Sequence, residues 1–123
     1  MRHTDRAGSR IGALMRTIQA DLQRPWTVTD MAAVLGVSDA QLRRLSARAI
    51  GATPRQLLCS IRLQAAAVLL HDPAIRVKEV QSRVGIADAS HFCRDFKDRF
   101  GVSPAEYRYQ CSQPPSDSAD TRT

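Results

Sequence analysis

Cysteine and histidine are scarce in this chain of 123 residues, with three of each. The odd number of cysteines, their wide spacing and the absence of a C-x-x-C pair argue against a disulfide framework and a zinc ribbon. The histidines add no metal-ligand cluster. We therefore expect a reducing compartment, no metal and no other cofactor. The residues concerned are Cys59, Cys93, Cys111, His3, His71 and His91.

Long apolar runs are also missing. The longest runs from about Leu63 to Leu70 and is interrupted by Gln64, well short of the roughly 20 residues that cross a membrane as a helix. The N-terminal sequence MRHTDRAGSR lacks the apolar stretch of a signal peptide. We expect a cytoplasmic protein. Because aromatic residues make up only 5% of the chain, its core should consist mostly of Leu, Val, Ile and Ala.

Positive charge is in excess, with 18 Lys and Arg against 12 Asp and Glu, a formal net charge of +6. Such a balance suits a polyanionic partner such as nucleic acid, although many basic proteins bind none. The length allows one compact domain or two very small lobes.

Helical periodicity dominates the chain, and the alternation typical of strands is absent. Ile11, Leu14 and Ile18 recur at three- and four-residue steps, which predicts a first helix over about 9–23. Thr27 with Asp30 is a capping-box variant that opens a short helix ending at Gly36. Further helices are expected over about 39–50, 54–71, 77–84, 88–100 and 104–109, which makes an all-α fold of seven helices.

The same pattern occurs twice, at an offset of 50 residues: QLRRLSARAIGATPRQLL at 41–58 and HFCRDFKDRFGVSPAEYR within 91–108. Each copy reads as a short helix, a tight turn and a longer helix, which is the helix-turn-helix arrangement. We expect a flexible leader at 1–8 and a DNA-binding domain at 9–110. Its parts would be a first lobe over about 9–53, a linking helix over about 54–71 and a second lobe over about 74–110. Residues 111–123 should be a disordered tail.

Each longer helix has an apolar side and a polar side. Arg44 and Arg94 occupy the same position of the repeat, and both fall opposite the apolar side. An exposed arginine there can donate two hydrogen bonds to guanine in the major groove. A lone arginine on a polar face is usually only solvated. Its recurrence in both copies, beside small residues that permit close approach, favours DNA binding.

The length of the predicted linking helix indicates why the helix-turn-helix unit occurs twice. About 18 residues at about 1.5 Å each span roughly 27 Å, and successive major grooves lie about 34 Å apart. One chain would then place two different recognition helices in adjacent grooves, at an asymmetric site. Arg48, Arg76 and Lys78 lie where backbone phosphates could pass.

Three segments resemble the AraC/XylS transcription regulators: TVTDMAAVLGVSDAQLRRL, IRLQAAAVLL and VGIADASHFCRDFKDRFGVSPAEYR. The resemblance covers about residues 9–109. It implies a seven-helix, two-lobed domain that contacts promoter DNA and recruits or positions RNA polymerase. The base-reading positions that it implies are Ala40, Arg43, Arg44, Ala47, Ala89, Ser90, His91, Cys93, Arg94 and Lys97.

The chain departs from that family at two packing positions. Ser46 replaces a usual aromatic residue, and Gln81 replaces a usual Ala, which we expect to loosen the brace against helix 88–100. The two recognition helices also differ in charge: residues 39–50 carry a net +2, whereas 88–100 are neutral. We therefore predict that the first unit supplies more affinity and that the second mainly adjusts specificity.

Other readings remain open. No nucleophile with a base, phosphate loop or metal cluster points to an enzyme. The chain is either a stand-alone regulator or the DNA-binding part of a longer sensor or enzyme fusion, because it has no room for a ligand-sensing domain. A protein-binding adaptor that has lost DNA binding is a further alternative. Cys93 is interpreted as a small apolar contact, and His91 faces either DNA or solvent.

Overall fold

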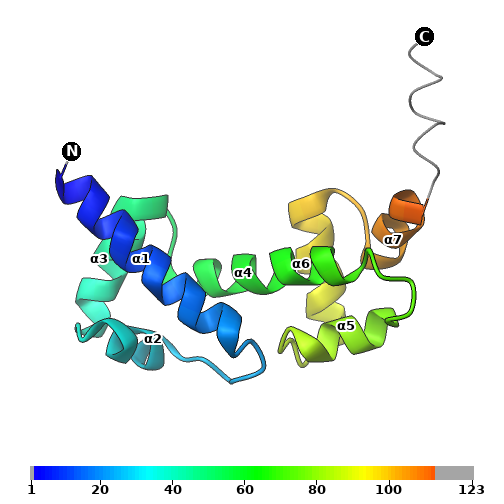
Figure 1. Cartoon of the computed structure of the whole chain (residues 1–123), viewed down its shortest axis with the longest axis horizontal. Helices are drawn as coiled ribbons and strands as arrows, with labels where there is room; N and C mark the ends of the chain where they lie inside the picture. Colours follow the sequence, from blue (N-terminus) through cyan, green and yellow to red (C-terminus); the bar gives the residue numbers. More distant parts are fainter. Residues whose placement is uncertain (1, 113–123) are drawn as a thin grey trace, which may run out of the picture. The chain divides into compact units, whose positions relative to one another are not determined.

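The computed structural model describes residues 2–112, and within this range it contains seven α-helices and no strand (Figure 1). The expected all-α, seven-helix fold is thereby confirmed. Across the same residues, no helix is long and apolar enough to cross a membrane. The helices are α1 Arg2–Ala20, α2 Val28–Leu35, α3 Asp39–Ile50, α4 Pro54–Leu69, α5 Val77–Arg83, α6 Ala89–Phe100 and α7 Pro104–Ser112.

The two ends of the chain differ from expectation. Helix α1 begins at Arg2 instead of Ser9, so residues 2–8 extend the helix, and the flexibility expected of the leader stays a prediction. No proline interrupts them, and the single Gly8 costs a helix only about 1 kcal/mol. Helix α7 continues through Cys111 to Ser112. The rest of the expected tail, residues 113–123, lies outside the described range.

Helix α1 ends at Ala20, three residues earlier than predicted, and the carbonyls of the segment that follows it accept side-chain hydrogen bonds. The indole Nε1 of Trp26 donates to the carbonyl of Asp21 at 2.9 Å. Arg62 of α4 donates to the carbonyls of Leu22 and Arg24 at 3.2 and 2.7 Å. The two bonds from Arg62 fasten α4 to the segment that follows α1. Trp26 is itself buried, in the core of the first unit.

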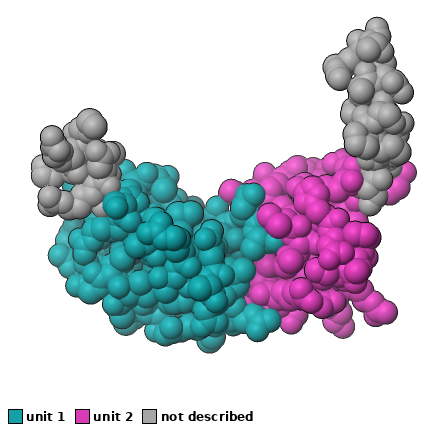
Figure 2. All heavy atoms as spheres, in the orientation of Figure 1, with its two compact units in different colours: residues 1–65 teal, residues 66–123 magenta. Residues whose placement is uncertain are grey.

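The chain divides into two compact units, residues 1–65 and 66–123, with the boundary inside α4 (Figure 2). Helices α1, α2, α3 and the first part of α4 build the core of the first unit. Its side chains are mostly aliphatic, as the composition predicts. The buried apolar members are Ile11, Leu14, Ile18, Trp26, Met31, Ala32, Leu42, Leu57, Leu58 and Ile61.

The core of the second unit combines aliphatic and aromatic side chains, and its buried apolar members are Ala66, Ala67, Leu70, Ile75, Val80, Val84, Phe92 and Phe96. Phe96 of α6 packs against Phe92, Phe100 and Tyr107, with ring centroids 5.9, 4.4 and 5.3 Å away. Arg108 of α7 donates to the carbonyls of Leu70, Asp72 and Ile75, at and beyond the C-terminal end of α4. This arginine therefore holds α7 against the segment that leads from α4 to α5.

Gln81, which we expected to loosen the brace, makes two hydrogen bonds within the second unit. Its Nε2 donates to the carbonyls of Ile86 and Ala87 at 3.0 and 3.1 Å. Because both carbonyls belong to the connection between α5 and α6, the amide ties the end of that turn back to α5. An alanine here would lack the donor.

Candidate nucleic-acid interface

In the first unit, local hydrogen bonds set the start of α3. Ser38 Oγ accepts from the backbone N–H of Gln41, and the backbone N–H of Ser38 donates to Gln41 Oε1, which is a capping box. The hydroxyl of Thr29 in α2 donates to Asp39 Oδ2 at 3.0 Å. Gly36, with a φ of 67°, supplies the left-handed residue that ends α2. The turn between the two helices is thus fixed at both ends.

The predicted reading positions of α3 lie on one exposed side. Leu42 and Ser46 are buried, and the side chains on the opposite face are exposed. Two of these are arginines and two are alanines. The small alanine side chains beside the charged groups would permit close approach to a base edge. The four exposed residues are Ala40, Arg43, Arg44 and Ala47.

Helix α6 has the same division in the second unit. Phe92 and Phe96 are 1% and 0% exposed, and the six predicted reading residues are all exposed. That exposure agrees with the sequence, whereas contact with bases stays a prediction. The six residues are Ala89, Ser90, His91, Cys93, Arg94 and Lys97.

A carboxylate occupies the N-terminal end of α6. Asp88 accepts backbone hydrogen bonds from Ser90 and His91 at 2.8 and 3.2 Å. These bonds lower the pKa of Asp88 below its usual value, with smaller contributions from the charges of His91 and Arg94. The corresponding cap of α3 is the neutral Ser38. Each recognition helix therefore begins with one carboxylate, Asp88 at the cap of α6 and Asp39 in the first turn of α3. The negative charge of Asp88 disfavours an approaching phosphate.

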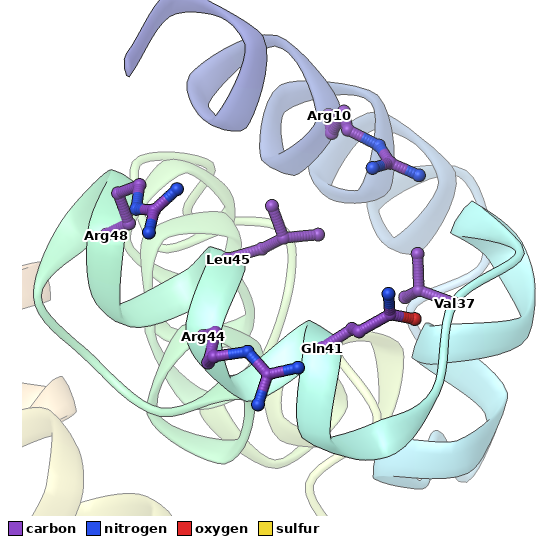
Figure 3. Close-up of a pocket in the computed structure, with 6 residues that line it drawn as sticks. All are labelled: Arg10, Val37, Gln41, Arg44, Leu45 and Arg48. Carbon is purple, nitrogen blue, oxygen red and sulfur yellow. The ribbon is translucent and has the colours of Figure 1, made fainter. Parts of the chain in front are cut away.

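A groove of about 180 Å³ lies between α1 and α3, beside the exposed side of α3 (Figure 3). Val37 and Leu45 supply apolar surface, and three arginines stand around them. Arg10 comes from α1, and its Nη2 donates to the carbonyl of Leu35 at 3.1 Å. The lining residues are Arg10, Val37, Gln41, Arg44, Leu45 and Arg48.

The predicted phosphate residues separate into two places. Arg48 lies in this groove together with Arg44. Arg76 and Lys78 are exposed at the start of α5, in the other unit. Arg10 was not identified from the sequence. Its position next to Ile11 at the edge of the apolar stripe was the available signal, but nothing in the sequence connects it with α3.

The cysteines provide no metal centre. Cys93 is exposed, and Cys111, expected in the tail, lies in α7 with its Sγ 3.8 Å from His71 Nε2. Cys59 is half-buried. In the part of the chain that the structure describes, no group of three or more His, Cys, Asp or Glu side chains could hold a metal ion.

The sequence is similar to a known protein family and to known transcriptional regulators. A family described as "Helix-turn-helix domain" matches residues 31–110. The uncharacterized HTH-type transcriptional regulator YidL of Escherichia coli is 38% identical over 109 residues, covering 89% of this chain and 37% of that protein. The HTH-type transcriptional regulator MtrA of Neisseria gonorrhoeae is 34% identical over 104 residues, covering 85% and 35%. The chain thus spans about a third of the length of these relatives.

Solved structures agree with the fold. An AraC-type regulator from Chromobacterium violaceum has a TM-score of 0.79 at 26% identity, covering 86% of this chain and 95% of that one. The DNA-binding domain of the global transcriptional factor AdpA, solved in complex with a target DNA, has a TM-score of 0.72 at 27% identity. That similarity covers 81% of this chain and 90% of the AdpA chain.

Proposed function

Because this chain belongs to the AraC-type family of helix-turn-helix domains, we propose that it binds promoter DNA sequence-specifically and regulates transcription. One observation carries the proposal: Arg44 and Arg94, at the same position of the two copies, are both exposed opposite a buried side of their helix. A structural role would not require an exposed arginine at this position twice. A role in base reading does, because the guanidinium fork matches guanine O6 and N7.

In this proposal, α3 and α6 lie in major grooves, and α2 and α5 brace them across the DNA backbone. The 16 residues of α4 rise by roughly 24 Å, a length compatible with grooves one helical turn apart when the width of the units is added. The two helices carry different side chains, so the bound site would be asymmetric. Arg48, Arg76 and Lys78 would contact phosphates and set the register.

The remaining partners follow from the family. The relatives include transcriptional activators, so we propose activation, with RNA polymerase as the second partner. Because those relatives are more than twice as long as this chain, the domain would be the output end of a protein that also senses a ligand. The proposed role is binding, without catalysis, in the cytoplasm.

The test is selection of binding sites from random duplex DNA, followed by titration of the enriched site at several salt concentrations. An asymmetric motif with two half-elements about one helical turn apart is expected, with affinity falling steeply as salt rises. If a single half-element appears, only one unit reads DNA. If no sequence is enriched and the response to salt is flat, the protein-binding adaptor replaces the regulator.

A further inference from the structure

The groove between α1 and α3 carries an inference beyond the predicted reading positions. We propose that it is a binding site for one sugar-phosphate unit of the DNA backbone, with Arg10 of α1 as a phosphate-binding residue. The proposal rests on DNA binding by α3, as proposed above. It adds helix α1 to the DNA-binding surface, to which only the helix-turn-helix elements had been assigned.

The chemistry of the lining fits this ligand on two counts. Three of the six lining residues are arginines and none is acidic, so the groove offers an anion three guanidinium groups, whose forks match phosphate geometry. Val37 and Leu45 provide apolar surface between them, suited to the carbon face of a deoxyribose. A cavity of about 150 Å³ takes up a benzene ring, so about 180 Å³ has room for one sugar ring.

The position of the groove identifies the source of the anion. Arg44 belongs both to the exposed reading side of α3 and to the groove. With α3 in the major groove, one sugar-phosphate backbone of the DNA must run along each side of that helix. The strand on the side of α1 would meet Arg48 from α3 and Arg10 from α1 (Figure 3). A DNA phosphate is therefore favoured over a free anion.

Arg10 is held in place before any ligand arrives. Its Nη2 donates to the carbonyl of Leu35 at 3.1 Å, at the C-terminal end of α2, and its side chain is half-buried. One donor of the guanidinium thus fixes the side chain while others remain for an anion. Such a side chain loses less conformational entropy on binding than a free surface lysine or arginine.

The experiment measures which phosphates matter. Ethylation interference on the selected site is compared for the unmodified protein and for Arg10→Ala. The matched control is Arg16→Ala, which removes the same charge from an exposed position of the same helix, about 120° around its axis. We expect Arg10→Ala to weaken binding about tenfold. It should also reduce the slope of log K against log salt by about 0.9, and abolish interference at a single phosphate beside the first half-element.

Arg16→Ala should leave all three readouts close to those of the unmodified protein. Equal losses in the two variants, or an unchanged interference pattern in Arg10→Ala, would overturn the proposal, because the charge would then act only through its long-range field. If Arg10→Ala unfolds, Arg10→Gln tests the same point with a neutral side chain that keeps an N–H donor. Failure of the unmodified protein to bind any duplex would refute the proposed function itself.

A second measurement separates DNA from a free anion. Methyl NMR signals of Val37 and Leu45 are followed during titration with benzoate, with inorganic phosphate and with the selected duplex. The proposal expects shifts with the duplex that are lost in Arg10→Ala. Saturable shifts with benzoate alone, together with its competition against the duplex, would instead assign the groove to a small anionic ligand.

Discussion

The hydroxyl of Ser46 donates a hydrogen bond to the carbonyl of Ala52 at 2.5 Å. Ser46 is 0% exposed, and so is Phe96, which holds the corresponding place in the second copy. The first unit thus replaces a ring contact by a polar bond that joins α3 to the connection leading into α4. Nearby, Ile50 is left 45% exposed, whereas Phe100 is half-buried against Phe96 and Tyr107.

Ser46→Ala should lower the free energy of unfolding by about 1–2 kcal/mol, because the Ala52 carbonyl loses its donor in a part-buried place. Urea titration followed by circular dichroism measures the change. Gln19→Ala, at an exposed position of α1, is the control and should be close to neutral. An effect of Ser46→Ala no larger than that of the control would mean that the hydroxyl contributes nothing.

Gln81→Ala should destabilise the second unit by about 1 kcal/mol, because the carbonyls of Ile86 and Ala87 both lose a donor. Hydrogen exchange should accelerate in residues 84–88 more than in α3. Slower exchange in this connection, or a higher midpoint of unfolding, would restore the view that glutamine loosens the brace.

Arg44→Ala and Arg94→Ala should each relax sequence preference in one half of the selected site, at a cost of about 1–3 kcal/mol per lost guanine contact. We expect the larger loss of affinity from Arg44→Ala, because α3 carries a net +2, whereas residues 88–100, which are α6 with its cap, are neutral. Fluorescence anisotropy with the selected duplex measures both variants. A far greater loss from Arg94→Ala would reverse the ranking of the two units.

Replacing the cap of α6 by the serine that caps α3 tests how the carboxylate of Asp88 affects DNA binding. Asp88→Ser keeps a cap at the start of the helix but removes the carboxylate that stands there. Affinity for duplex DNA should rise about threefold at low salt, and the gain should shrink as salt screens the charge. Asp39→Ser, which removes one carboxylate from the first turn of α3, provides a comparison in the other unit. Unchanged affinity for Asp88→Ser would show that this carboxylate does not face the DNA.

Acid should destabilise the second unit through two carboxylates. Backbone and side-chain hydrogen bonds from Ser103 lower the pKa of Glu106, and backbone N–H groups lower that of Asp88. The folded state therefore holds these protons more weakly than the unfolded state, whose Asp and Glu pKa values are about 3.9 and 4.3. Their contribution to stability is complete above those values and disappears as the pH falls through the lower folded values. Thermal melts between pH 6 and pH 2.5 should show a smaller acid-induced loss for Asp88→Asn than for the unmodified protein.

Much of the fold was readable because its signals are local. The capping pair Thr27 and Asp30 forms as predicted, with both bonds close to 3 Å. Helix α3 has the predicted bounds, between the Ser38 cap and Gly51 with its φ of 66°. Hydrogen bonds that act within about four residues, together with the 3.6-residue period of buried side chains, determine such elements.

The exposed reading faces could also be predicted from the sequence, since the buried positions Leu42 and Phe92 define the opposite side of each helix. The groove between α1 and α3 could not be predicted from the sequence. Arg10 and Leu35 are 25 residues apart, and no local pattern says which carbonyl a surface arginine will reach. The same holds for Arg62 and for Arg108, whose partners lie more than 30 residues away.

The sequence by itself therefore determined the helices, their caps, the duplicated unit and the side of each recognition helix that faces outward. The tertiary structure decided that Gln81 closes a turn and that Ser46 bonds to Ala52. It also decided that Arg10 stands opposite Arg44 and Arg48. The physical reason is the range of the forces involved: periodicity and capping act along one helix, whereas a hydrogen bond between helices exists only after apolar packing has brought the two backbones together.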